Sequence, residues 1–404
     1  MGNVPKLRFA EFNTKWDKKN LEKYGELVRG LTYSPDDIRE EGLLVLRSSN
    51  IKNNEFTLNI DNVYVDMQIK EEYLTQKNDI LICVRNGSKR LIGKSTIINN
   101  SLEYATHGAF MSVFRGKYNK FIYHWMQTPL YYKQVHKNLG ATINSINGSD
   151  LKKFKTYFPQ KQEQEKIASF LSYVDKKLEK LEKKIALQEK YKKAMMQKLF
   201  SQEIRFKTDD GSDFPDWKEK KFKDFVLDYR LGGNYANSEE ETRYPLIKMG
   251  NISRGKINLK KIEFIKECEE ISNIDIIKYG DIFFNTRNTL DLVGKVAIWR
   301  NELPLAYYNS NLMWMKFENN FFMNYRLNSY QGLKVLRRIA TGTTSVAAIY
   351  TKDLLKIKLE IPSLKEQQKI ANFLSSLDKK IEATKKQKQK ANEFKKGLLQ
   401  QMFV

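Results

Sequence analysis

The segment that comes nearest to a catalytic motif runs from Gly87 to Ser95. Its glycines, lysine and serine are similar to those of a nucleotide-binding P-loop, in which backbone amides surround the phosphates and the lysine reaches the terminal ones. A P-loop has its two glycines five residues apart, whereas Gly87 and Gly93 are six apart. The corresponding stretch in the second half of the chain, residues 288–296, lacks both the first glycine and the final hydroxyl residue. We therefore expect no ATP site here.

Histidine and cysteine, which hold most transition metals in proteins, are scarce. The histidines are His107, His124 and His136; none has the spacing of a metal motif, and the last two are expected on a helix surface. Cys83 and Cys268 lie far apart, so neither a disulfide framework nor a zinc ribbon is predicted. An amino-methyltransferase loop would need two adjacent prolines, and no two of the eight prolines are adjacent. The sequence predicts no catalytic residue, no metal site and no cofactor in this chain.

The charge balance indicates a polyanionic partner instead. Lys and Arg number 71 against 48 Asp and Glu, which gives a net charge of +23. Such an excess is typical of proteins that bind nucleic acid. No apolar run approaches the roughly 20 residues needed to cross a bilayer, and the first residues lack the hydrophobic block of a secretory signal. Charge alone does not separate DNA from a membrane surface, but with no span or signal in the sequence we expect a cytoplasmic protein that binds nucleic acid and no membrane.

Side chains suited to DNA lie on turns beside expected strands. Arg, Lys, Asn, Ser and Thr can pair with base edges in the major groove, and they bind phosphates equally well. In the first half of the chain these candidates are Arg47, Ser49, Asn50, Arg85, Asn86, Lys94, Thr142 and Asn144. In the second half they are Lys248, Asn251, Arg287, Asn288, Lys295, Thr343 and Thr344. For each of them a base contact, a phosphate contact and a solvated turn all stay open.

The chain is a tandem repeat with an offset of about 201 to 203 residues. Residues 163–177 and 366–380 share eleven identities over fifteen aligned positions. Weaker matches pair Trp16 with Trp217, Asn50-Ile51 with Asn251-Ile252, and Gly93-Lys94 with Gly294-Lys295. A repeat of about 200 residues is too long for a solenoid. Each copy should therefore be a domain with a connector, and the two copies should be related by a pseudo-two-fold.

Each globular part is expected to mix strands and helices. Apolar, β-branched segments between Gly, Asn and Asp turns predict strands at residues 42–46, 79–84, 281–285 and 295–299. Residues 121–136 are predicted to form one helix. At the end of each copy, apolar residues alternate from Phe154 to Phe158 and from Ile357 to Ile361, which predicts a strand that stops at the following proline.

A long helix is expected after each of these prolines. Apolar residues recur there in steps of four and three, as in the seam of a coiled coil. Ser363 and Glu366 predict a capping box at the start of the second helix. We expect the two helices to pack antiparallel, and pairing with another copy of the chain is the alternative. The expected seam residues are Ile167, Leu171, Val174, Leu178, Leu181 and Ile185 in the first helix, and Ile370, Leu374, Leu377 and Ile381 in the second.

The length of the first helix suggests a spacing role. From Ile167 to Leu199 it covers about 33 residues, or roughly 50 Å at about 1.5 Å per residue. B-DNA repeats every ~34 Å, so domains at opposite ends of such a rod could enter major grooves about one turn apart. The expected fold is mixed α/β. Its globular domains are placed at residues 1–160 and 204–362, and its long helices at residues 161–203 and 363–404.

This duplicated arrangement closely resembles the specificity (S) subunits of type I restriction-modification systems. The resemblance covers the whole chain. It rests on a proline followed by Glu-Gln-x-Lys-Ile-Ala-x-Phe-Leu, which opens a long helix at residues 159–171 and again at 362–374. It implies two target-recognition domains, each reading one half of an interrupted site in double-stranded DNA. It also implies that the helices set the spacing and dock methyltransferase subunits, which we expect to be two.

The same resemblance implies that catalysis belongs to partner subunits. The methyltransferase subunits carry S-adenosylmethionine and methylate adenine, and a restriction subunit, where one accompanies them, uses ATP and magnesium. Two other classes of function stay open on the sequence alone. One is an enzyme with a divergent site, and the other is a coiled-coil scaffold whose two adaptor domains bind DNA without sequence preference.

Overall fold

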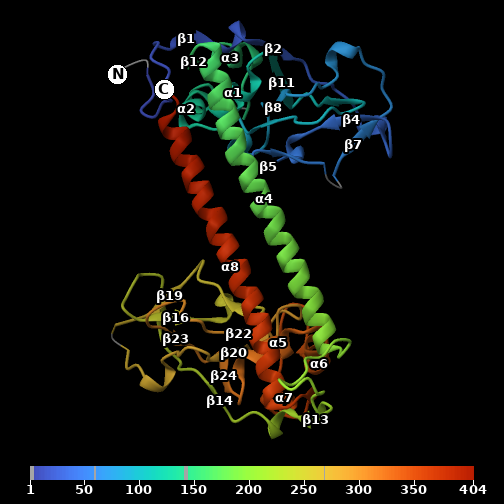
Figure 1. Cartoon of the computed structure of the whole chain (residues 1–404), viewed down its shortest axis with the longest axis vertical. Coiled ribbons are helices and arrows are strands. Elements are labelled where there is room, and N and C mark those ends of the chain that lie inside the picture. Colours follow the sequence, from blue (N-terminus) through green and yellow to red (C-terminus); the bar gives the residue numbers. More distant parts are fainter. Residues whose placement is uncertain (1–3, 59–60, 141–143, 268) are drawn as a thin grey trace. The chain divides into compact units, whose positions relative to one another are not determined.

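The computed structural model describes residues 4–58, 61–140, 144–267 and 269–404 (Figure 1). The chain divides into two compact units. Unit 1 comprises Met1–Lys183 and Lys386–Val404, and unit 2 comprises Lys184–Lys385. Each unit therefore contains one globular part and a portion of both long helices. No helix of the described residues is long and apolar enough to span a membrane.

Within its described residues, the globular part of unit 1 contains two four-stranded sheets and three short α-helices. The central sheet has the order β2-β11-β8-β9, and the outer sheet has the order β10-β4-β7-β3. Two-stranded pairs join β1 to β12 and β5 to β6. The strands are β1 (Asp17–Asn20), β2 (Gly25–Val28), β3 (Ile38–Arg39), β4 (Leu43–Leu46), β5 (Ile51–Lys52), β6 (Glu55–Phe56), β7 (Val63–Val65), β8 (Ile80–Cys83), β9 (Ser95–Ile97), β10 (Ala105–His107), β11 (Met111–Gly116) and β12 (Lys155–Phe158). The helices are α1 (Asn119–Trp125), α2 (Pro129–Lys137) and α3 (Gly148–Lys152).

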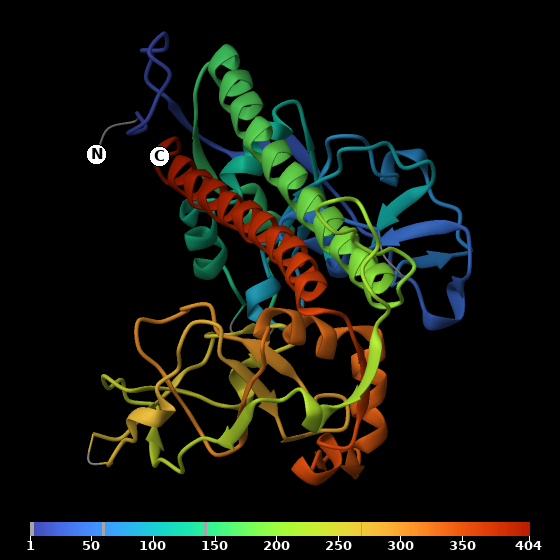
Figure 2. The same cartoon turned by 60° about the horizontal axis from the view of Figure 1, so that its bottom comes forward.

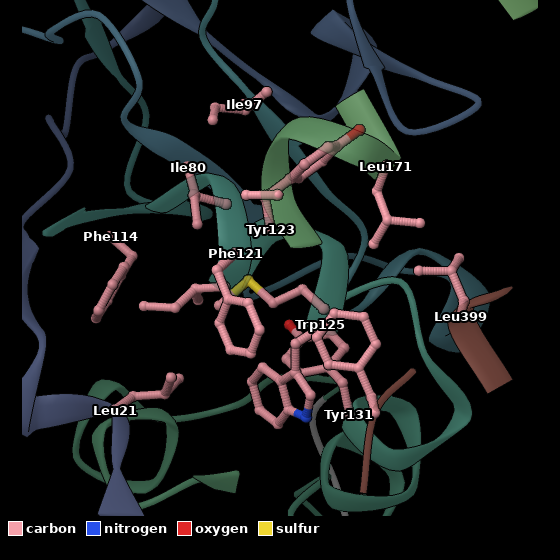
Figure 3. Close-up of a cluster of buried hydrophobic side chains, with 14 of the residues drawn as sticks. Leu21, Ile80, Ile97, Phe114, Phe121, Tyr123, Trp125, Tyr131, Leu171 and Leu399 are labelled. Atoms are coloured by element: carbon pink, nitrogen blue, oxygen red, sulfur yellow. The ribbon is translucent and has the colours of Figure 1, made fainter. Parts of the chain in front are cut away.

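Strand β8 shows how the layers of unit 1 are held together. Successive side chains of a strand point to opposite faces. Ile80 and Ile82 therefore join the core beneath the helices, together with Trp125 and Tyr131 (Figure 3). Leu81 and Cys83 face the other way and pack against the outer sheet. The apolar run predicted as a strand at residues 79–84 is confirmed, and its lack of polar alternation follows from burial on both faces.

Residues 121–136 form two helices, so the prediction of a single helix was wrong. α1 ends at Trp125 and α2 begins at Pro129. Thr128 lies between them, and its hydroxyl caps α2 by accepting from the backbone N–H of Tyr131. Pro129 has no N–H to donate to a preceding turn, but it suits the first position of a new helix.

Unit 2 repeats this order of elements. Its central sheet is β14-β24-β20-β22, its outer sheet is β15-β19-β16-β23, and β13 pairs with β27. The strands are β13 (Lys218–Lys221), β14 (Asp228–Leu231), β15 (Asn237–Ser238), β16 (Pro245–Ile247), β17 (Ile252–Ser253), β18 (Lys256–Ile257), β19 (Glu263–Ile265), β20 (Ile282–Asn285), β21 (Arg287–Asn288), β22 (Val296–Ile298), β23 (Tyr307–Tyr308), β24 (Leu312–Lys316), β25 (Thr341–Gly342), β26 (Ala347–Ala348) and β27 (Lys358–Ile361). The helices are α5 (Asn320–Asn328), α6 (Tyr330–Ile339) and α7 (Thr351–Leu354). The strands predicted near residues 281–285 and 295–299 are confirmed as β20 and β22.

The two long helices are α4 (Lys161–Phe200) and α8 (Leu364–Gln401), and they pack antiparallel as expected (Figures 1 and 2). In unit 1 the start of α4 shares one core with the end of α8, and in unit 2 the end of α4 shares one core with the start of α8. Leu181 and Ile185 are only half-buried. The other predicted seam residues are buried, namely Ile167, Leu171, Val174, Leu178, Ile370, Leu374, Leu377 and Ile381.

Ion pairs join the helices where their apolar seams are interrupted. Asp175 of the repeated Asp-Lys-Lys sequence pairs with Lys395 at 2.6 Å in unit 1, and the equivalent Asp378 pairs with Lys192 in unit 2. Asp378 also accepts a hydrogen bond from the hydroxyl of Tyr325 at 2.6 Å. The repeated aspartates therefore connect the two helices rather than being left to solvent.

The glutamate of the repeated motif makes the same buried contact in both copies. In unit 1, Nε and Nη2 of Arg8 each donate to an oxygen of Glu163 at 2.7 Å. In unit 2, Arg205 donates to Glu366 at 3.1 and 2.9 Å, and Nε1 of Trp217 adds a third bond at 3.2 Å. Each pair ties the segment that precedes a globular part to the start of a long helix.

The predicted capping box at Ser363 and Glu366 was wrong. Glu366 is fully buried, and its carboxylate accepts hydrogen bonds from Arg205 and Trp217. The Ser363 hydroxyl has no hydrogen-bond partner among the described residues. Gln367 instead reaches back, and its amide donates to the carbonyl of Pro362 at 3.1 Å. Gln164 makes the matching bond to Pro159 at 2.7 Å in unit 1.

Two buried histidines make the stability of unit 1 depend on pH. His124 was expected on a helix surface, but it is buried beside Ser172, and burial, aided by the charge of Lys395, lowers its pKa to about 3. Asp175 lies 3.8 Å from its Nδ1 but is already paired with Lys395. His107 contacts the carbonyl of Val28, and burial lowers its pKa to about 4. Both residues are therefore neutral in the folded protein at physiological pH.

Acidification to pH 6 should lower the free energy of unfolding of unit 1 and leave that of unit 2 unchanged. The unfolded chain takes up protons at these histidines below about pH 6.5 whereas the folded chain does not, so stability falls as the pH drops. Between pH 7.5 and 6 we expect unit 1 to lose about 1.5 kcal/mol in total. Unit 2 contains no histidine and is the internal control. Hydrogen exchange, corrected for intrinsic rates, measures both units, and an equal loss in the two would contradict the expectation.

Candidate nucleic-acid interface

Three loops of unit 1 meet beyond the ends of its central strands. The Asn86 side chain donates to the hydroxyl of Ser48 at 3.3 Å, which joins the loop after β8 to the turn after β4. The Asn144 side chain donates to the carbonyl of Gly87 at 2.9 Å, and the Asn86 N–H donates to the carbonyl of Asn144. Arg85 also bridges to Ser145 through the backbone. The candidates Arg85, Asn86 and Asn144 therefore lie in one cluster with the turn that carries Arg47 and Ser49.

Exposed cations lie on this cluster in unit 1. Arg47 and Arg85 are exposed, and the guanidinium of Arg85 lies 5.5 Å from the centre of the Phe110 ring, itself 58% exposed. Lys89 and Arg90 follow on the same loop, also exposed. Exposed guanidinium and ammonium groups on neighbouring loops can contact both phosphates and base edges. Thr142 lies outside the described residues.

Unit 2 joins two of the corresponding loops in a similar way. Arg287 and Asn288 form β21, which pairs with β26 of the β25–β26 hairpin. The tip of this hairpin carries the exposed candidates Thr343 and Thr344. The N–H of Leu290 donates to the carbonyl of Thr344 at 3.2 Å, which fastens the loop after β21 to the hairpin. Arg287 is exposed at the edge of this arrangement.

Two of the residues predicted to contact DNA, Asn50 and Asn251, instead stabilise the turns on which they lie. Asn50 is 1% exposed and Asn251 is 4% exposed. The side-chain oxygen of Asn50 accepts from the N–H of Arg47 at 2.8 Å, and that of Asn251 accepts from Lys248 at 2.9 Å. Their amide nitrogens donate to backbone carbonyls across each turn. Because both ends of each amide are occupied, we leave these two residues out of the proposed DNA contacts.

The three candidate lysines lie in different environments. Lys94 is half-buried, and its ammonium donates to the carbonyl of Ile51. Lys248 forms an ion pair with Glu263 at 2.8 Å. Lys295 is half-buried near Arg254. The turn lysines are therefore not equivalent in their availability to a phosphate.

No cluster of three or more His, Cys, Asp or Glu side chains that could hold a metal ion occurs within the described part of the chain. Burial raises the pKa of the Cys83 thiol to about 11, so this thiol is protonated. The groups that gather on the loops are guanidinium, ammonium, amide and hydroxyl groups. They are donors suited to binding nucleic acid.

The chain thus contains two sheet-and-helix parts, each with donor-rich loops and each attached to portions of the antiparallel helices α4 and α8. The family model for the type I restriction modification DNA specificity domain matches residues 13–189 and again residues 215–393. The chain therefore belongs to this family and contains two copies of its domain. The resemblance drawn from the repeated helix-opening motif is confirmed.

Named relatives and a solved structure agree with this assignment. The putative type I restriction enzyme MjaX specificity subunit of Methanocaldococcus jannaschii is 29% identical over 214 residues, which cover 51% of this chain and 50% of that protein. The type I restriction enzyme EcoKI specificity subunit of Escherichia coli K12 is 23% identical over 87% of this chain and 79% of its own length. The crystal structure of the type I S subunit from M. genitalium covers 99% of both chains with a TM-score of 0.62 and 20% identity. That last similarity is one of fold.

Proposed function

We propose that this chain selects the DNA site of a type I restriction-modification complex, with each globular part reading one half of an interrupted double-stranded sequence. The observation that carries the proposal is the pairing of two donor-rich loops, which occurs once in each of the two matched domains. The framework of this pairing is shared, whereas many side chains on it differ. Lys89 and Arg90 follow Asn86 in unit 1, whereas Leu290 and Asp291 follow Asn288 in unit 2.

Different side chains on a common framework should read different bases. Base edges in the major groove present a distinct pattern of donors, acceptors and methyl groups for each base pair. The cationic loop of unit 1 suits acceptor edges such as those of guanine, whereas the exposed Leu290 of unit 2 suits an apolar contact such as the thymine methyl. The two half-sites should therefore have unrelated sequences.

The long helices are proposed to set the spacing between the half-sites and to dock the methyltransferase subunits, two per chain. Continuous helical hydrogen bonding makes α4 and α8 suitable as spacers. Several large apolar side chains on them are exposed, with Tyr173 at 68%, Leu187 at 66%, Tyr191 at 51% and Phe394 at 56%. Exposed aromatic groups are frequent anchors of protein interfaces.

Catalysis is assigned to the partners. In this proposal the chain has no catalytic site, the methyltransferase subunits bind S-adenosylmethionine, and a restriction subunit, where present, uses ATP and magnesium. Because the substrate is the DNA of the host cell, the complex would act in the cytoplasm.

Selection from random double-stranded DNA tests the proposal. The full chain, purified with the methyltransferase of its host, should enrich one sequence made of two defined segments separated by a fixed unspecified spacer. Binding should weaken steeply with salt, because phosphate contacts release counterions. Enrichment of no sequence would favour a scaffold that binds DNA non-specifically. Methylation or cleavage by the chain alone would show that it is an enzyme.

A further inference from the structure

Three cations of unit 2 gather where the β17–β18 hairpin, the start of β22 and helix α6 meet. The N–H of Gly255 donates to the carbonyl of Val296 at 2.7 Å, so the hairpin lies against β22. This contact brings Arg254 and Lys295 close together. Leu336 of α6 packs on Gly294, and the next residue, Arg337, lies near enough to Arg254 for the two charges to interact. We call these three residues the cation cluster.

The cation cluster lacks a negative charge. Arg254 uses Nη2 to donate to the backbone carbonyl of Asp291 at 3.1 Å, and its Nη1 is buried without a hydrogen-bond partner. Among the residues that the structure describes, no carboxylate forms an ion pair with Arg254, Lys295 or Arg337. An unsatisfied donor of a charged group is costly to bury. The missing partner should therefore be an anion from outside the chain.

The electrostatics of the cluster agree with this geometry. Burial, followed by the charge of Arg337, lowers the pKa of Arg254. Burial, followed by the charge of Arg254, lowers the pKa of Lys295. Like charges in a partly desolvated site disfavour one another, and a bound anion would relieve that repulsion.

The place of the cluster identifies the class of anion. Asp291, which accepts from Arg254, lies on the loop that runs from β21 to β22, and this loop also carries Leu290, bonded to Thr344 of the candidate interface. Guanidinium groups match the geometry of phosphate oxygens. The phosphates nearest to a base-reading loop are those of the DNA that it reads.

We propose that Arg254, Lys295 and Arg337 bind a phosphate group of the DNA backbone, and that this contact belongs to the second domain alone. The inference rests on the proposed function and adds an asymmetry to it. Binding of the half-site read by the second domain should depend on this ionic contact, while the first domain lacks it.

The matching position in unit 1 shows why the contact is asymmetric. Its β5–β6 hairpin has the register of β17–β18, with Ile51 opposite Phe56 as Ile252 is opposite Ile257. Asn53 consequently takes the place of Arg254. Val135 packs on Gly93 as Leu336 packs on Gly294, so His136 takes the place of Arg337. Of the three cations, only Lys295 has a lysine, Lys94, at the matching position of unit 1. The ammonium of Lys94 is already hydrogen-bonded to the carbonyl of Ile51.

The test measures how binding of the selected DNA depends on salt. Full-length Arg254→Gln and Lys295→Gln variants, each assembled with the methyltransferase, should reduce the slope of log K against log salt by about 1. The preference for the selected sequence over random DNA should not change, because a phosphate contact carries no sequence information. The ammonium of Lys295 makes no hydrogen bond or ion pair with a described residue, and the backbone carbonyl of Lys295, which accepts from Asn285, is kept in the variant, so the replacement should leave folding intact.

Two controls make the result specific. Lys220→Gln removes the same charge from an exposed position on β13 and should leave the slope unchanged. Lys94→Gln removes the equivalent lysine of unit 1, and it should also leave the slope unchanged. Unchanged slopes for Arg254→Gln and Lys295→Gln would overturn the phosphate site, as would an altered sequence preference. An equal effect of Lys94→Gln would overturn the asymmetry. A wild-type complex without sequence preference would instead refute the proposed function itself.

Discussion

Replacing Arg205 with alanine should destabilise unit 2 by about 3–5 kcal/mol, because it leaves the carboxylate of Glu366 buried without a counter-charge. Glu366 is 0% exposed, and Arg205 donates to both of its oxygens. Water that enters the space left by the guanidinium would supply hydrogen bonds but no positive charge. The remaining hydrogen bond from Trp217 is a neutral donor and cannot offset a full charge.

Urea unfolding together with hydrogen exchange of residues 204–217 and 364–377 would measure this loss. The double variant Arg205→Ala with Glu366→Gln should recover a large part of the stability, because the neutral amide needs no counter-charge. Lys261→Ala is the matched control. It breaks an ion pair of 2.6 Å with Glu239 in which both side chains are largely exposed, and it should cost about 1 kcal/mol or less. A loss as small as that of the control for Arg205→Ala would contradict the role given to this pair.

The sequence predicted those parts of the fold that rest on local periodicity. The ladder of apolar residues from Ile167 onward defines α4 because helical spacing is visible in any short window. The clean alternation that ends at Phe158 defines β12 for the same reason. The antiparallel packing of α4 and α8 followed because each helix has a single apolar stripe to cover.

Contacts between distant residues were not visible in this way. Arg205 and Glu366 are 161 positions apart, and the capping pattern at Ser363 wrongly suggested that the glutamate acts locally. A signal was nevertheless present. Leu7-Arg8-Phe9 and Ile204-Arg205-Phe206 repeat the same arrangement ahead of the two globular parts. Since Phe9 and Phe206 also form matching edge-to-face contacts with Phe170 and Phe373, the repeat marks a structural contact.

The candidate interface shows a second reason why prediction from the sequence was incomplete. Asn50 and Asn251 occupy matching positions in the two copies and were predicted to contact DNA. In the structure, their side-chain amides stabilise the turns on which they lie. A comparison of the two repeats selects the residues that they share. Shared residues maintain the framework common to both domains, so they are poor candidates for contacts that differ between the half-sites. The comparison did not select Arg254, because the equivalent residue of the first copy is Asn53. The residues that distinguish two half-sites should be sought among such differences.

The central claim is that the two globular parts each read one half of a single interrupted DNA site. Adenine methylation mapped across the host genome by long-read sequencing tests it most directly. The strains to compare carry the intact gene, a deletion, and a chimaera in which residues 1–160 come from another member of the family.

Deletion should abolish methylation at one interrupted motif, and the chimaera should change only one half of that motif while keeping the other half. This outcome would give both half-sites and their spacing together. An unchanged methylome after deletion, in cells where the methyltransferase is expressed, would contradict the assignment as the specificity subunit. A chimaera that changed both halves would contradict the division of the site between the two domains.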